Sequence, residues 1–318
     1  MIITIFSYWF MEIDSTFSPV YNNLPTGELE RRAKIAYEHM IECDLCARQC
    51  GVNRMTGASG VCRIGIQAKI SSFGAHFGEE KPLSGWRGSG TIFFTRCNLR
   101  CQYCQNFSIS QTDSGCEVET DELASIMINL QNQGCHNINL VSPSHVVPQI
   151  LRALAIAVQL GLHIPLVYNT GGYDSLSTLK MLDGVIDIYM PDMKYSNCGV
   201  AYRLSRVRDY PSINRVAVLE MHRQVGDLQI DKQGLAQHGL LIRHLVLPRN
   251  LAGTKEVMKF IERDISRNTY VNIMAQYHPA YNSHHYPEIN RLITDCEFQA
   301  ALEDAIQVGL TRLDRITL

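Results

Sequence analysis

The stretch FFTRCNLRCQYCQNF, residues 93–107, places Cys97, Cys101 and Cys104 within eight residues of one another. Their spacing is C-x3-C-x2-C, and it follows an apolar run, TIFFTR (91–96), that predicts a buried strand. A structural zinc ion takes four protein ligands, and so does an iron–sulfur cluster with no open position. Three clustered cysteines leave one coordination position open, which is typical of a centre that takes part in chemistry.

Strand-like and helix-like segments alternate after this stretch. The expected strands are 91–96, 137–142, 164–170, 185–192, 240–248 and 270–277. The expected helices are 121–134, 144–161, 174–184, 211–226, 253–265 and 293–309. Apolar strands separated by helices predict an α/β fold with a parallel sheet covered by helices.

Six β/α units favour a partial (β/α)6 TIM-like barrel over a full barrel of eight units, which usually needs about 250 residues. An open doubly wound sheet is the alternative. In both folds, ligands bind at the carboxyl ends of the strands. The triple-cysteine stretch follows the first strand directly and therefore lies at that edge.

A second group of cysteines lies in CDLCARQCGVNRMTGASGVC (43–62). Its members, spaced C-x2-C-x3-C-x11-C, are Cys43, Cys46, Cys50 and Cys62. Four thiolates suit one zinc ion or a closed second iron–sulfur cluster. A structural role is favoured because no acid or base lies among these ligands. We expect residues 1–85 to form an N-terminal cysteine-rich metal-binding extension and residues 86–318 to form the barrel domain.

The composition is that of an ordinary globular protein: 318 residues, 46% hydrophobic and 19% charged. The net charge of −2 gives no broad basic surface, so we expect no nucleic-acid partner. The opening MIITIFSYWF lacks a basic leader and a cleavage site, which predicts neither a signal peptide nor a membrane span. It is expected to form a local packing element, with a translation start at Met11 as the alternative.

Eleven cysteines without an export signal argue against a disulfide scaffold and indicate metal binding in the cytoplasm. Seven of the eleven belong to the two groups above. A lone cysteine is most often a small buried side chain. That is the expectation for the remaining four, Cys116, Cys135, Cys198 and Cys296.

The C-x3-C-x2-C spacing after a first strand resembles the radical S-adenosylmethionine superfamily. That resemblance implies a [4Fe–4S] cluster on Cys97, Cys101 and Cys104, with S-adenosylmethionine on the free iron. It also implies reductive cleavage of the cofactor to a 5′-deoxyadenosyl radical, which removes hydrogen from a substrate. Tyr103 corresponds to an aromatic residue near the adenine, and the electron donor is expected to be a flavodoxin or ferredoxin.

Other stretches resemble the glycyl-radical-enzyme activases. They are VYNTGGYD (167–174), MPDMKY (190–195), IRHLVLPRN (242–250) and MAQYHPAY (274–281). A more specific likeness is to the PflX group of pyruvate formate-lyase activating-enzyme-like proteins, over about residues 40–315. It is carried by GCHNINLVSPSHVVPQI (134–150), EMHRQVGDL (220–228) and YPEINRLIT (286–294).

The activase resemblance implies roles for individual residues. Lys194 would approach the cofactor's carboxylate or sulfonium, Arg243 its carboxylate or ribose, and His278 its ribose or adenine. A monovalent cation would be held by Asn169, Thr170, Asp192 and the carbonyl of Met190. The residues alone leave simpler alternatives open: a strand-end ion pair between Asp192 and Lys194, and a hydrogen-bonded core position for His278.

One stretch departs from the activases. They carry Gly-Gly-Glu at the end of the second strand, where it meets the cofactor's amino group, whereas this chain has VSPSH (141–145). Ser142, Ser144 or His145 is expected to accept from that ammonium group instead. The ferredoxin-like cysteine insertion of many activases is also absent from the sequence.

Three functions are compatible with these features. The first is a radical enzyme that takes hydrogen from a protein or peptide, such as a glycyl residue. The second keeps the radical chemistry but acts on a small molecule or nucleotide. The third is a non-catalytic iron–sulfur or zinc protein for electron transfer or scaffolding, which would cleave no cofactor.

Overall fold

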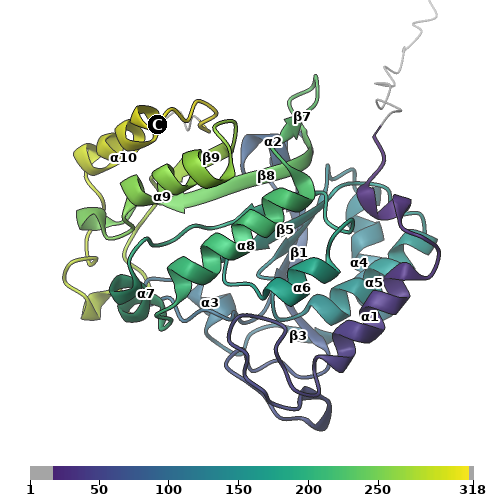
Figure 1. Cartoon of the computed structure of the whole chain (residues 1–318). Helices are drawn as coiled ribbons and strands as arrows, with labels where there is room; N and C mark the ends of the chain where they lie inside the picture. Colours follow the sequence, from purple (N-terminus) through teal and green to yellow (C-terminus); the bar gives the residue numbers. More distant parts are fainter. Residues whose placement is uncertain (1–16, 315–318) are drawn as a thin grey trace, which may run out of the picture.

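The computed structural model describes residues 17–314, so the predicted packing element in the first ten residues lies outside the described part. A nine-stranded sheet forms the centre of the molecule (Figure 1). Six of its strands are parallel and neighbour one another in chain order. They are β2 (Ser89–Phe94), β4 (Ile138–Val141), β5 (Leu166–Thr170), β6 (Ile188–Pro191), β8 (Ala236–Leu245) and β9 (Tyr270–Met274).

The longer helices occupy the connections between these strands, as expected. They are α4 (Thr120–Asn132), α5 (Val147–Gln159), α6 (Leu176–Met181), α8 (Tyr210–Val225), α9 (Thr254–Phe260) and α10 (Asp295–Gln307). The prediction of a mixed α/β fold with a central sheet is confirmed. A doubly wound sheet reverses its strand order at a switch point, and no reversal occurs from β2 to β9.

Three short helices and one longer helix were not expected from the sequence: α1 (Glu28–Glu38), α2 (Lys81–Ser84), α3 (Phe107–Ser110) and α7 (Cys198–Ser205). The mean hydropathy of α1 is low, and only Leu29, Ala33 and Ala36 are buried on its inner face. Its helical signal is therefore weak, and its position depends on packing against α5.

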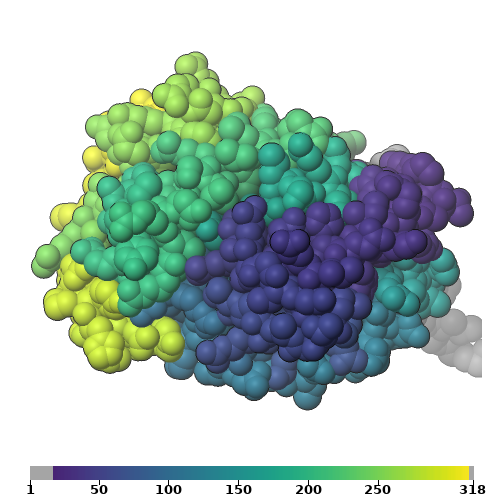
Figure 2. Space-filling model, turned by 60° about the horizontal axis from the view of Figure 1, so that its bottom comes forward, coloured from purple at the N-terminus to yellow at the C-terminus, as the bar shows by residue number. Residues whose placement is uncertain are grey.

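Two antiparallel strands extend the sheet beyond β2. β1 (Ala68–His76) pairs with β2, and β3 (Cys116–Val118) pairs with β1. The apolar pattern of β1 is weak because its buried positions are confined to its first half. Figure 2 shows the purple and dark-blue N-terminal segment lying against the later green and teal parts of the chain. The predicted domain boundary after residue 85 falls between α2 and β2 and stays a prediction.

The interior strands are almost wholly buried, which explains their continuous apolar sequence. Every residue of β5 and β6 is buried. On one side of the sheet, Leu140, Leu166 and Tyr168 belong to the same core as apolar residues of α4 and α5. This packing fixes the strand ends relative to one another. Within residues 17–314, every helix is too short or too polar to cross a membrane.

Leu140 tests the account of this core because it lies fully buried on a central strand. We expect Leu140→Ala to lower the free energy of unfolding by about 2–5 kcal/mol, since it removes buried methyl groups and leaves a cavity. Leu160→Ala is the matched control, because Leu160 is 58% exposed. It should change stability by less than about 0.5 kcal/mol. Equal losses in a urea titration would contradict the assigned packing.

Candidate functional site

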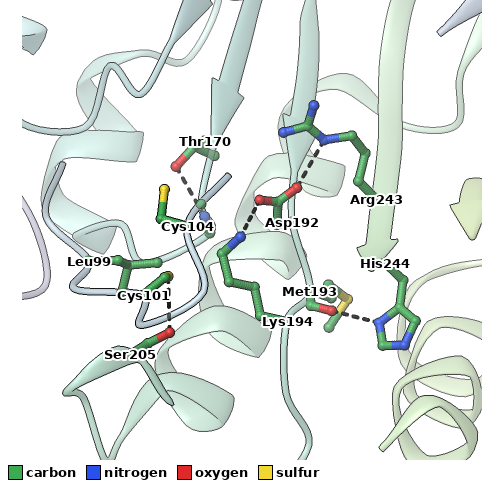
Figure 3. Close-up of polar contacts among 12 residues, drawn as sticks. Leu99, Cys101, Cys104, Thr170, Asp192, Met193, Lys194, Ser205, Arg243 and His244 are labelled. Carbon is green, nitrogen blue, oxygen red and sulfur yellow. Dashed lines mark hydrogen bonds and ion pairs between the residues drawn. The ribbon is translucent and has the colours of Figure 1, made fainter. Parts of the chain in front are cut away.

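The loop after β2 carries the three clustered sulfurs at the carboxyl edge of the sheet. The Cys101 Sγ lies 3.0 Å from Ser205 Oγ, at the end of α7. The Cys104 Sγ lies 3.1 Å from Ser110 Oγ, in α3. Neither short helix was predicted, yet each supplies a hydroxyl that orients a sulfur. Figure 3 shows Cys101 and Cys104 on this loop, facing the strands that carry the charged residues described below.

Cys97 completes the group, and its Sγ accepts a hydrogen bond from the backbone N–H of Leu99 at 3.4 Å. Burial, together with the neighbouring Cys101, raises the pKa of the Cys97 thiol to about 12. Metal ligands must be thiolates, so a cation is needed to bring these sulfurs into their charged form. Their softness and number fit a cluster with one open iron. Among residues 17–314, no group of three or more His, Cys, Asp or Glu side chains is already arranged to hold a metal ion. The cluster assignment therefore depends on the type and number of these sulfur donors.

A charged network lies beside the thiols, on neighbouring strands. The Asp192 carboxylate, just after β6, accepts from Lys194 Nζ at 2.5 Å and from Arg243 Nε on β8 at 2.9 Å. Arg243 Nη2 also donates to Asn169 Oδ1, on β5, at 2.7 Å. Figure 3 shows the Lys194 amine and the Arg243 guanidinium reaching Asp192 from opposite sides. The structure thus brings together four residues that the sequence had singled out separately.

The charges in this network are mutually stabilised. Burial alone would raise the pKa of Asp192, but Arg243 and Lys194 outweigh it and hold that pKa below its ordinary value. Burial opposes the charge on Lys194, but Asp192 and the nearby Cys101 together raise the pKa of the amine above its ordinary value. Lys194 therefore stays charged between a carboxylate and a cysteine sulfur. The alternative of a strand-end ion pair is confirmed in its geometry, and it does not exclude a ligand.

The backbone around Asp192 is fixed by its neighbours. Its carbonyl accepts from Tyr210 Oη at 2.9 Å and from Asn214 Nδ2 at 3.0 Å, both on α8. Gly172 has φ +73°, and a Cβ there would lie 2.3 Å from the Asp192 carbonyl oxygen. Only glycine allows the loop after β5 to approach so closely. Asn214 lies in the helix predicted over 211–226 and Tyr210 directly precedes it, but nothing in the sequence pattern marked either as a support for the site.

The residues predicted to hold a monovalent cation are partly engaged already. The side-chain oxygens of Asn169 and Asp192 accept from Arg243, and Thr170 Oγ1 donates to Asp174 Oδ2 at 2.7 Å. A cation would compete with Arg243 for two of its ligands. The monovalent cation stays a prediction.

Three other predicted residues, Ser142, His278 and Tyr103, differ in their environments. Ser142 adopts a left-handed conformation after β4, and its N–H donates to the Asn169 carbonyl at 2.9 Å. His278 is exposed, with Nδ1 2.7 Å from Nε2 of Gln105 in the cysteine loop. The core position considered for His278 is therefore wrong. Tyr103 is buried, and its hydroxyl accepts from Tyr195 at 2.7 Å.

The two serines and the histidine of VSPSH separate in the structure. The Ser144 hydroxyl lies 3.1 Å from Thr170 Oγ1. His145 is buried, with Nε2 3.1 Å from the Thr95 carbonyl, and it lines a cavity at the other cysteine group. Ser142 is the member of the three that follows a strand end directly beside Asn169. The replacement for Gly-Gly-Glu stays a prediction.

The glycine-rich stretch 76–90 carries two carboxylates that are largely shielded from solvent. Glu80 is buried and accepts from Asn272 Nδ2 at 2.9 Å. The Glu79 side chain is only 9% exposed, and its carboxylate lies 3.9 Å from Arg243 Nη1. Burial raises the pKa of Glu79, while Arg243 opposes that shift. Glu79 therefore joins the charged network, which the sequence could not show because the partner lies on a distant strand.

The second cysteine group also converges in space. Its members, with Arg54 and His145, surround one small cavity: Cys43, Cys46, Cys50 and Cys62. The loop that carries them docks on the first site, because Arg48 Nε donates to the Asn98 carbonyl at 2.7 Å. Arg54 lies within the quoted cysteine stretch, and His145 lies about a hundred residues later. Only the fold brings them together.

The four isolated cysteines were each expected to be buried, and one of them is. Cys135 is buried, whereas Cys116, Cys198 and Cys296 are exposed. Within residues 17–314 no cysteine is joined to another by a disulfide bond. The expectation of a buried side chain is wrong for the three exposed positions because each lies at the start of an element on the surface.

One curated protein is similar over most of the chain. It is the uncharacterized protein MJ0674 of Methanocaldococcus jannaschii, 32% identical over 289 residues, which cover 89% of this chain and 79% of that protein. The chain belongs to the family of this protein. No protein-family model matches the sequence.

Solved structures are similar over part of the chain. A radical SAM methyltransferase from Sphaerobacter thermophilus has a TM-score of 0.47 and 13% identity, covering 69% of this chain and 64% of that one. HydG, a maturase of the [FeFe]-hydrogenase, has a TM-score of 0.48 and 13% identity, covering 69% of this chain and 48% of that one. The chain thus spans less than two thirds of either structure. At these values the likeness carries no argument about what this protein does.

The charged network generates a stability prediction. Asp192→Asn should lower the free energy of unfolding by about 3 kcal/mol at pH 7, since it leaves two largely buried cations without their carboxylate. Asp183→Asn is the matched control, because Asp183 pairs with Arg223 at 2.6 Å but both side chains are about half exposed. It should cost less than about 1 kcal/mol. Urea unfolding of both variants measures the difference.

The pKa of Asp192 fixes how the free energy of unfolding changes with pH. Because that pKa is held low in the folded protein, Asp192 makes its full contribution to stability above the carboxyl pKa of the unfolded chain, about 4. The contribution is lost as the pH falls through the folded pKa. The gap between wild type and Asp192→Asn should therefore shrink below about pH 4. A gap that stays constant on acidification would contradict the network's ionisation.

Proposed function

We propose that this protein is a radical S-adenosylmethionine enzyme. Cys97, Cys101 and Cys104 would hold a [4Fe–4S] cluster, and the adjoining charged residues would hold S-adenosylmethionine. When bound, the cluster and cofactor supply a 5′-deoxyadenosyl radical that takes hydrogen from the substrate. The observation that carries the proposal is the position of Lys194, which lies between the Asp192 carboxylate and the three-cysteine loop at the carboxyl edge of a parallel sheet.

The charges of this chain support an anionic ligand at that edge. Lys194 and Arg243 bring two positive charges to the single carboxylate of Asp192. Lys194 also acts on the neighbouring thiols, and its charge suits the cofactor's carboxylate or a thiolate-bound cluster. Asn169 and Glu79 hold the guanidinium from its other side. Asp192 would then act as a positioning residue, fixing both cations before the cofactor binds.

The site is built to exclude water around the reacting atoms. Leu99, Tyr103 and Tyr195 are buried in one apolar cluster with Cys101. Burial of this kind protects a reactive radical from side reactions. Ser142 and His278, at the rim, would contact the amino group and the ribose or adenine, as the activase resemblance implies. The buried hydroxyl of Tyr103 means that its contact with the adenine would come from the ring and not the oxygen.

We also propose a more specific fold and a substrate class for this enzyme. The six parallel strands would form a partial (β/α)6 barrel whose open side admits a protein or peptide segment, such as a glycyl loop. A flavodoxin or ferredoxin would supply the electron, and the site would work in the cytoplasm. A small-molecule substrate remains the second candidate.

Cys101 tests the cluster assignment. In anaerobically reconstituted protein reduced with dithionite, wild type should convert S-adenosylmethionine to 5′-deoxyadenosine, measured by liquid chromatography. Cys101→Ala should lose the activity to the no-protein background, because a cluster ligand is removed. Cys116→Ala is the matched control, since Cys116 is exposed. Iron assembly without any cofactor cleavage in wild type would favour the electron-transfer or scaffold function instead.

Lys194 tests the binding role separately from cluster assembly. Lys194→Met should weaken S-adenosylmethionine binding about 10- to 100-fold, because it removes a charge-assisted contact. Iron per chain should stay at the wild-type value. Calorimetry on the reconstituted, unreduced protein measures the affinity. Lys180→Met, at an exposed position of α6, is the control, and equal affinity in the two variants would remove Lys194 from the site.

A further inference from the structure

Beyond the radical site, the structure contains a second built cavity. The residues that line it include Cys43, Cys46, Cys50, Arg54, Cys62 and His145. Cys43, Cys46 and Cys62 are buried, and Cys50 is partly buried. Four soft donors around one space are the ligand set of a structural metal centre.

Backbone groups already point at these sulfurs. The Val61 N–H donates to Cys50 Sγ at 3.5 Å. A Cβ on Gly60 would lie 2.7 Å from Cys50 Sγ, so this loop wraps closely around that sulfur. N–H groups directed at sulfur are favourable when the sulfur is charged.

Arg54 provides the decisive charge argument. It is 1% exposed, and within residues 17–314 no carboxylate lies in ion-pair distance of it. Its guanidinium donates to the carbonyls of Gly65, at 2.8 Å, and His145, at 2.9 Å, and its Nη1 lies 3.9 Å from Cys43 Sγ. A buried cation needs a compensating negative charge. The sulfurs are the nearby groups that can supply it, provided that they are thiolates.

The histidine adds an independent observation. His145 is 2% exposed, and its Nδ1 has no hydrogen-bond partner. A buried polar atom of this kind calls for an explanation. A polar metal centre in the adjoining cavity is such an explanation, whereas four neutral thiols are weak partners.

The cavity between the sulfurs is small. Its volume is about 10 Å³, which is room for roughly one water-sized body. A single ion fits among the sulfurs without opening the loop.

We infer that Cys43, Cys46, Cys50 and Cys62 bind one zinc ion as a negatively charged thiolate centre, and that the buried Arg54 compensates its charge. The site is structural. It braces the radical site through two contacts between the cysteine loops: Arg48 donates to the Asn98 carbonyl, and Arg100 donates to the Val61 carbonyl. The Cys46 backbone also forms a bridge with Asp174, next to the end of β5.

The experiment isolates this site by removing the first one. The full chain carrying Cys97→Ala, Cys101→Ala and Cys104→Ala is purified, and zinc and iron per chain are measured by mass spectrometry. We expect zinc near one per chain and no iron. Adding Cys46→Ser should abolish the zinc. Iron in place of zinc, or zinc unaffected by Cys46→Ser, overturns the inference, and neither result depends on the radical proposal.

Arg54 is tested by metal exchange. In the same background, Arg54→Leu should weaken zinc retention against a chromogenic chelator by about 10- to 100-fold, the usual effect of losing a group that supports metal ligands. Arg54→Lys should restore part of the retention. Arg152→Leu, on the exposed face of α5, is the control. Retention equal to the control in Arg54→Leu would overturn the charge role. If Arg54→Leu does not fold, the zinc measured per chain with and without Cys46→Ser still tests whether these cysteines bind zinc.

Discussion

The buried carboxylate of Asp192 is the constraint on which the site depends. It accepts from Lys194 and from Arg243, so it holds together charged side chains that belong to adjacent strands. Placing one negative and two positive charges in a largely buried position is costly unless each is paired. The surrounding structure meets this condition through Asn169, Glu79 and the hydroxyl and amide groups of α8. Lys194 also acts on the thiols of the cysteine loop, which makes that edge a site for an anionic ligand.

The order of the strands could be predicted from the sequence because their residues are buried on both faces. Such strands appear as continuous apolar runs, and the helices between them have clear ends. β1 and α1 were not predicted because few of their residues are buried. β1 is buried only in its first half, and α1 buries just three residues, so local pattern is weak and tertiary contacts decide the structure.

The candidate site was predictable where chemistry is concentrated in short stretches, as in the two cysteine groups and the Asp192–Lys194 pair. It was not predictable where partners are far apart in sequence. Glu79 meets Arg243 across 164 positions of chain, and Arg54 meets His145 across 91. A sequence pattern records neither contact, because both arise from the way the N-terminal segment folds back on the sheet. The two cysteine loops are also in direct contact, through Arg48 with the Asn98 carbonyl and Arg100 with the Val61 carbonyl.

The central claim is that the three-cysteine loop and the charged network form one site, at which a cluster and S-adenosylmethionine meet. Electron paramagnetic resonance of the reconstituted, reduced protein tests it most directly. The account predicts a [4Fe–4S] signal whose g-values change when S-adenosylmethionine is added, because the cofactor binds the open iron. A signal that stays unchanged at saturating cofactor would contradict the account.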